Sequence, residues 1–232
     1  MRSAKAIFNK QLRDTFKNRM VLVQFFIFPI MAFIMTELVA KSDDTIPNNI
    51  FVTMFGAMFV GMMPLMTSAV AIAEDREHKS LRFLIMAGVK PWEYLFGIAG
   101  FFLLLSSIAS VIFGLIGGFK GIEFFKFLIV LIIGAVASTI LGAVIGIISK
   151  NQQAATALGM PVAMVFAFCP MISEFDKTVE KVSSIFYTQQ INILVNDFSV
   201  SMMKPFLIIA ANVVVFAILF IIVYSKKGIA DE

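Results

Sequence analysis

The chain has 232 residues, of which 59% are hydrophobic and only 15% are charged, with a formal net charge of +4. A soluble globular protein is about 45–50% apolar and about 25% charged, so the composition excludes that class and predicts an integral membrane protein. The single cysteine, Cys169, excludes an internal disulfide and a metal cluster built on cysteines.

Residues 1–19 have the pattern of a basic amphipathic helix. Apolar residues recur every four positions, and the basic residues lie away from that stripe. Such a helix lies in the membrane interface and is attracted to anionic lipid. Its interfacial contacts are expected from Phe8, Leu12, Arg13, Phe16 and Lys17. Two roles stay open for it, a passive anchor and the docking of a partner.

Six apolar segments are long enough to cross a bilayer as helices, which rise 1.5 Å per residue. The segments do not alternate over about ten residues as barrel strands do. The predicted spans are 21–38, 48–73, 95–118, 127–149, 155–172 and 205–224. We therefore expect an all-α fold in which residues 1–232 form a single transmembrane domain.

Basic residues are unevenly divided between the two sides that these spans define. Thirteen of the 19 Lys and Arg residues fall on the side that holds both termini and the segment 74–93. Because the side richer in Lys and Arg is the cytoplasmic one, both termini are expected inside.

The segment 74–93 is dense in charge, yet it contains an apolar patch and lies between two spans. One interpretation is a solvated loop that partly lies on the lipid surface. The other is a short helix that presents a mixed surface to a cytoplasmic partner. Trp92 and Tyr94 are expected to be interfacial anchors where the third span begins.

The span 127–149 carries small residues at four-residue spacing, namely Gly134, Ser138, Gly142 and Gly146. Small residues on one stripe let two helix backbones approach closely. A contact within one subunit is favoured over a contact between subunits.

The segment 173–204 begins with charged residues and then becomes apolar with polar interruptions. It is too short and too polar to span the membrane. Short re-entrant or interfacial helices before the sixth span are expected, with an amphipathic loop on the lipid surface as the alternative.

The sequence lacks the motifs that bind nucleotides or catalyse reactions, and its spans lack the charged residues that proton-coupled carriers use. It has no Walker A loop and no catalytic constellation, and its one histidine, His78, lies in the charged segment, so no metal site is expected. No span has a charged residue near its middle, which argues against a proton-coupled carrier. Carbonyl and hydroxyl groups would still be able to bind Na⁺.

Residues 74–84 (EDREHKSLRFL) and 91–97 (PWEYLFG) resemble the segment after the second span in membrane subunits of ABC-2 type ATP-binding-cassette exporters. The basic start, with residues 12–19 (LRDTFKNR), and Pro29 in the first span agree with that family. The chain departs from it at 79–80, where Gly-Thr is usual, and at Ile98, where Lys is usual.

The resemblance implies a permease subunit in a bacterial plasma membrane that exports a peptide or an amphipathic, drug-like small molecule. Its partners would be two copies of an ABC ATPase subunit, which bind ATP and Mg²⁺, a second permease subunit, identical or homologous, and membrane lipid, but no nucleic acid. The positions that would couple it to the ATPase are Glu74, Asp75, Glu77, Ser80, Leu81 and Leu84. The permease itself would not be an enzyme.

Two alternatives stay open. One is a membrane-anchored immunity or sensor protein that binds an antimicrobial peptide without pumping it. The other is a Na⁺-coupled carrier.

Overall fold

The computed structural model describes residues 2–17, 19–42, 45–173, 175–199 and 201–227. These ranges contain helices, turns and bends but no strand. The helices are α1 (Arg2–Lys17), α2 (Arg19–Leu38), η1 (Ala40–Ser42, a 3-10 helix), α3 (Ile50–Glu77), α4 (Ser80–Met86), α5 (Pro91–Ile116), α6 (Gly121–Ile148), α7 (Gln152–Ser173), α8 (Lys177–Ser183), α9 (Tyr187–Asn196) and α10 (Met203–Lys227).

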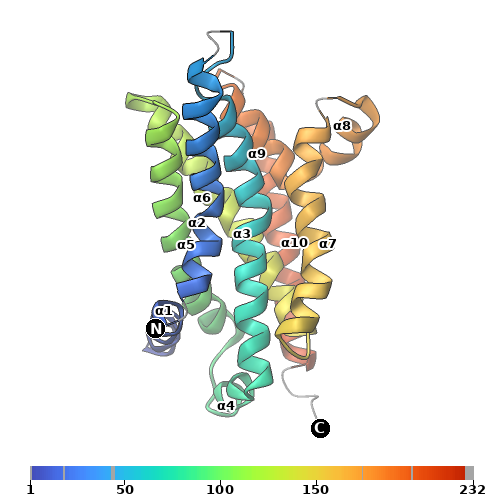
Figure 1. Ribbon diagram of the computed structural model, residues 1–232. Helices are drawn as coiled ribbons and strands as arrows, with labels where there is room; N and C mark the ends of the chain where they lie inside the picture. The colour runs from blue at the N-terminus through green and yellow to red at the C-terminus, as the bar shows by residue number, and fades with distance from the viewer. Residues whose placement is uncertain (1, 18, 43–44, 174, 200, 228–232) are drawn as a thin grey trace.

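Six of these helices, α2, α3, α5, α6, α7 and α10, are long and apolar enough to cross a membrane. They stand side by side, with α1 and α4 at one end of the bundle and α8 at the other (Figure 1). We call these the α4 end and the α8 end. The predicted all-α membrane fold with six spans is confirmed.

The spans differ from the predicted ones mainly in how far they extend at their ends. Helix α3 continues to Glu77, because a helix is able to extend beyond the bilayer through charged residues. Helix α5 already begins at Pro91, because proline is well suited to the first position of a helix. Helix α5 ends before Gly118, whose φ of 67° is a left-handed conformation that glycine adopts without strain. The charged segment 74–93 is therefore divided among three helices.

Helix α3 lies at the centre of the bundle, where it packs against α2, α5, α6, α7 and α9. It is the most buried of the six spans, whereas α10 is the least buried. Residues along the whole length of α3 belong to the buried interior, including Val52, Leu65 and Asp75.

The small residues of α6 face α3 in the same chain. A Cβ atom on Gly142 would lie 2.8 Å from the carbonyl carbon of Leu65, and one on Gly146 would lie 2.7 Å from the carbonyl oxygen of Ala69. Gly134 has equally close neighbours on α3 and α9. Without side chains at these positions, the two backbones come close enough for dense packing.

Polar side chains join α3 and α6 along the same contact. Ser138 donates a hydrogen bond to the carbonyl of Val60 and shares another with the Tyr187 hydroxyl at 2.7 Å. Ser68 donates to the carbonyl of Thr139 at 3.1 Å. Each such bond between helices in a membrane contributes about 0.6–2 kcal/mol.

The segment before α10 forms two short helices with different surroundings. Helix α8 is mostly exposed, and Asp176 caps it by accepting hydrogen bonds from the amides of Thr178 and Val179. Most of α9 is buried among α3, α6, α7 and α10. Short helices were expected here, with an amphipathic loop on the lipid surface as the alternative, and α9 is a short helix packed among other helices rather than such a loop.

We predict that Gly142→Ala destabilises the protein by about 1–3 kcal/mol, because the added methyl group overpacks the contact with Leu65. The matched control is Gly56→Ala on α3, where the new Cβ would lie 3.6 Å from Leu131, an ordinary distance. That control should be neutral or gain up to about 1 kcal/mol from helix propensity. Thermal denaturation in detergent measures both, and equal melting temperatures for the two variants would contradict the contact.

We also predict that cysteines placed singly at Ile191 and Leu194, in a chain without Cys169, resist a membrane-impermeant thiol reagent. Both positions are buried among helices, whereas a cysteine at the exposed Lys177 should react. Labelling of intact cells measures the rates. Fast and equal labelling at all three positions would rule out the buried placement of α9.

Candidate functional site

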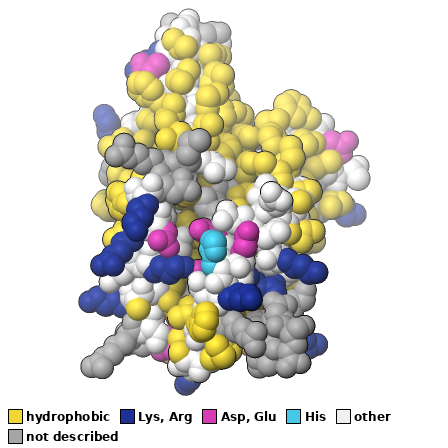
Figure 2. Space-filling model, turned by 60° about the horizontal axis from the view of Figure 1, so that its bottom comes forward, with side chains coloured by type: hydrophobic (Ala, Val, Ile, Leu, Met, Phe, Trp, Pro, Cys, Tyr) yellow, Lys and Arg dark blue, Asp and Glu magenta, His cyan; other side chains and the backbone are white. Residues whose placement is uncertain are grey.

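Charged side chains gather on the face of the molecule at the α4 end (Figure 2). Figure 2 shows basic and acidic groups mixed on this face, with hydrophobic side chains covering the flanks of the bundle. The ends of α3 and α10 and the whole of α1 and α4 lie at this end (Figure 1).

Helix α4 is a separate unit between two left-handed residues. Lys79, with φ of 58°, turns the chain out of α3, and Gly88, with φ of 78°, ends α4. The amides of Gly88 and Val89 donate to the carbonyls of Ile85 and Leu84, which closes the last turn. A seven-residue helix is marginal alone in water, so its packing on α3 is needed to hold it.

The two faces of α4 differ in exposure. Leu81 is buried against the core, and Leu84 and Ile85 are half-buried. Phe83 and Met86, by contrast, are 66% and 64% exposed. Three residues apart on a helix, they are neighbours on one face, so α4 presents an apolar surface outward within a charged region.

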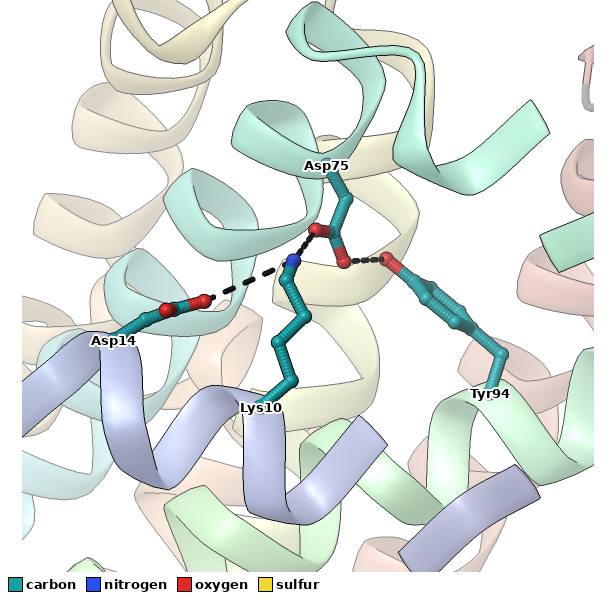
Figure 3. A network of polar contacts seen from close by, with 4 residues as sticks. All are labelled: Lys10, Asp14, Asp75 and Tyr94. Carbon is teal, nitrogen blue, oxygen red and sulfur yellow. Dashed lines mark hydrogen bonds and ion pairs between the residues drawn. The ribbon is translucent and has the colours of Figure 1, made fainter. Parts of the chain in front are cut away.

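Asp75 lies inside the protein and joins three helices. Its side chain receives the Lys10 ammonium group of α1 as an ion pair and the Tyr94 hydroxyl of α5 at 2.8 Å (Figure 3). The residue is only 2% exposed. Its buried carboxylate is thus paired and hydrogen-bonded, as such groups must be.

Arg76 and Glu77 connect the end of α3 to two further helices. Arg76 donates to the carbonyls of Ile147 and Ser149 at the end of α6, and Glu77 accepts from the amide of Gln152 at the start of α7 at 3.2 Å. A cation at a helix C-terminus and an anion at an N-terminus both complement the helix dipole.

The residues expected to couple the chain to an ATPase lie in different surroundings. Asp75 and Leu81 are buried inside the protein. Glu74 and Ser80 are half-buried, and Glu77 is exposed. The two most exposed apolar residues of α4 were not among the expected residues, although the apolar patch indicated them. Tyr94, expected as an interfacial anchor, is fully buried.

Helix α1 packs its apolar side on α5 rather than leaving all of it for lipid. The Phe8 and Phe101 rings meet edge to face with centroids 6.0 Å apart, and Gly97 leaves room for Ile7. Leu12 is half-buried against the core. The exposed residues of the expected interfacial set are Arg13, Phe16 and Lys17.

The described part of the chain contains no group of three His, Cys, Asp or Glu side chains placed to hold a metal ion. The α4 end offers the exposed apolar face of α4 and the polar links from the last turn of α3 to α1, α5, α6 and α7.

We predict that Lys10→Met destabilises the protein more than Asp75→Asn does. Removing the lysine leaves a buried carboxylate without its cation, a loss of about 3–5 kcal/mol in buried pairs. Removing the carboxylate leaves a lysine that is 43% exposed and is hydrated by water, at a cost of about 1–3 kcal/mol.

The double variant Lys10→Met, Asp75→Asn should be more stable than Lys10→Met alone, because no buried charge is then left unpaired. Denaturation midpoints of the four proteins in detergent measure the coupling. Strictly additive losses would contradict the ion pair.

The comparisons with known proteins agree with this architecture. A search of curated proteins finds no match to the chain. The family model described as ABC-2 type transporter matches residues 2–187, which include α1, the first five spans and α4. The chain therefore belongs to the ABC-2 type transporter family and is a multi-pass membrane transport component, a transporter permease.

Proposed function

We propose that this chain is the permease subunit of an ATP-driven exporter and that α4 is the helix through which a separate ATPase acts on it. The observation that carries the proposal is the outward apolar pair Phe83 and Met86 on α4. Large apolar side chains in a charged, water-facing region mark an interaction site. Buried aromatic anchors within a polar rim are the usual source of binding energy in protein interfaces.

Force applied to α4 would reach most of the bundle. The helix follows α3 directly and is followed by α5. The last turn of α3 binds α1 and α5 through Asp75, α6 through Arg76 and α7 through Glu77. Because these links lie next to the start of α4, a displacement of α4 would shift several spans together.

An external energy source also suits the composition of the spans. Their middle parts contain no Lys, Arg, Asp or Glu, the groups that proton-driven carriers commonly use. We therefore assign ATP and Mg²⁺ to the ATPase and none to this chain, which makes the permease the non-catalytic subunit.

The assembly that we propose has two permease subunits, identical or homologous, and two ATPase subunits in a bacterial plasma membrane. The α4 end and both termini would face the cytoplasm, since basic residues are concentrated there, and residues 1–232 would form one transmembrane domain. The cargo would be a peptide or an amphipathic, drug-like molecule.

We predict that the double variant Phe83→Ala, Met86→Ala lowers the affinity for the ATPase encoded nearest to this chain by at least about tenfold, because two apolar anchors are removed. Co-purification and cargo-stimulated ATP hydrolysis measure the effect. The matched control is Phe175→Ala, which removes an 83% exposed phenylalanine at the α8 end and should change neither.

Unchanged co-purification of the double variant would contradict the role of α4. A chain that binds an antimicrobial peptide but never co-purifies with an ATPase would instead be a sensor or immunity protein. Transport that persists without ATP and stops when the Na⁺ gradient is removed would identify an ion-coupled carrier.

A further inference from the structure

A cavity of about 240 Å³ lies between α1, α2, α3, α5 and α7 on the α4 side of the bundle. Pockets for drug-sized ligands are usually about 300–1,000 Å³, so this one suits a small molecule or one end of a larger one. Gln24, Thr156 and Met160 line it and are exposed. Its mouth therefore lies between α2 and α7.

Two carboxylates line the cavity, Asp14 from α1 and Glu74 from α3. The ammonium group of Lys10 is engaged by Asp75 and lies 3.9 Å from the Asp14 carboxylate (Figure 3). Glu74 forms no hydrogen bond or ion pair through its side chain with another residue that the structure describes, and the charges that act on it come from Lys10, Asp14, Asp75 and His78. Three carboxylates thus share one lysine, which leaves the cavity with an excess of negative charge.

Two polar side chains of α1 that line the cavity are available to a ligand. Gln11 is 8% exposed and Thr15 is 3% exposed, and both line the cavity. Neither side chain has a hydrogen-bond partner among the described residues. A ligand with polar atoms would be able to form hydrogen bonds with these two side chains.

Much of the remaining wall is apolar and adaptable. It is formed mainly by Met62, Met66, Met160 and Phe102. Methionine side chains are flexible and polarizable, so they adjust to ligands of different shape. An apolar group beside the carboxylates would be well accommodated.

We infer that this cavity binds an organic cation that carries an apolar group, with Glu74 and Asp14 as its counter-ions. The described residues hold no group of three metal-ligating side chains, so the acidic pair suits an ammonium or guanidinium group better than a metal ion. The ligand would be an arylalkyl amine or a basic side chain of a peptide. This inference rests on the proposed function, because it names the chemical class of the cargo.

Calorimetry on the purified chain in detergent tests the inference with 4-phenylbutylamine and 4-phenylbutanol, which differ in charge but little in shape. We expect the amine to bind at least about tenfold more tightly, because a hydrogen bond between charged groups is stronger than one that involves a neutral donor. Glu74→Gln should abolish this preference and Asp14→Asn should reduce it. Glu180→Gln, a change of an exposed carboxylate on α8, should leave it intact.

Equal binding of amine and alcohol by the wild-type chain would overturn the inference, and so would an undiminished amine preference in Glu74→Gln. A capped dipeptide of phenylalanine and lysine is the third probe. Tighter binding of the dipeptide than of the amine points to a peptide cargo, the reverse order points to small amines, and either supports a cationic ligand.

The assay contains no ATPase, so its result is separate from that of the α4 variants. Loss of amine selectivity in a chain that still co-purifies with its ATPase would overturn only the cation site. If the wild-type protein binds no ATPase but still selects the amine over the alcohol, only the proposed coupling would be overturned.

Discussion

The close contact between α3 and α6 is the constraint on which the rest of the structure depends. In a membrane, lipid is as apolar as the helices, so helices associate through dense packing and hydrogen bonds rather than through hydrophobic burial. Gly142 and Gly146 provide the packing, and Ser138 and Ser68 provide bonds to backbone carbonyls. Helices α2, α5, α7 and α9 then pack around α3.

Helix α3 also connects the two ends of the molecule. At its centre it is fixed to α6, and at its last turn Asp75, Arg76 and Glu77 hold α1, α5, α6 and α7. Helix α4 follows after a single left-handed turn at Lys79. Glu74, in the last turns of α3, lines the cavity between α1, α2, α3, α5 and α7. In the proposed exporter, a partner that binds at the α4 end would therefore change the packing around this cavity through α3.

The sequence predicts the spans and the α6 stripe because length, apolarity and four-residue spacing are local properties. The surroundings of Asp75 are not local: Lys10 is 65 residues away and Tyr94 is 19 residues away, so a carboxylate in a charged segment was expected on the surface. Likewise, the sequence shows an apolar patch in α4, but only packing against α3 decides that Leu81 faces inward and Phe83 outward. The burial of α9 and the cavity arise from contacts among several helices, which no single segment reveals.

The most direct measurement of the central functional claim is photo-crosslinking from α4 in native membranes. A photoreactive phenylalanine analogue in place of Phe83 would sit at the centre of the outward apolar face, and the same analogue in place of Phe175 would sit at the α8 end. We expect a crosslink to an ABC ATPase from position 83 and none from position 175. Absence of an ATPase adduct at position 83, or equal adducts at both positions, would contradict the account.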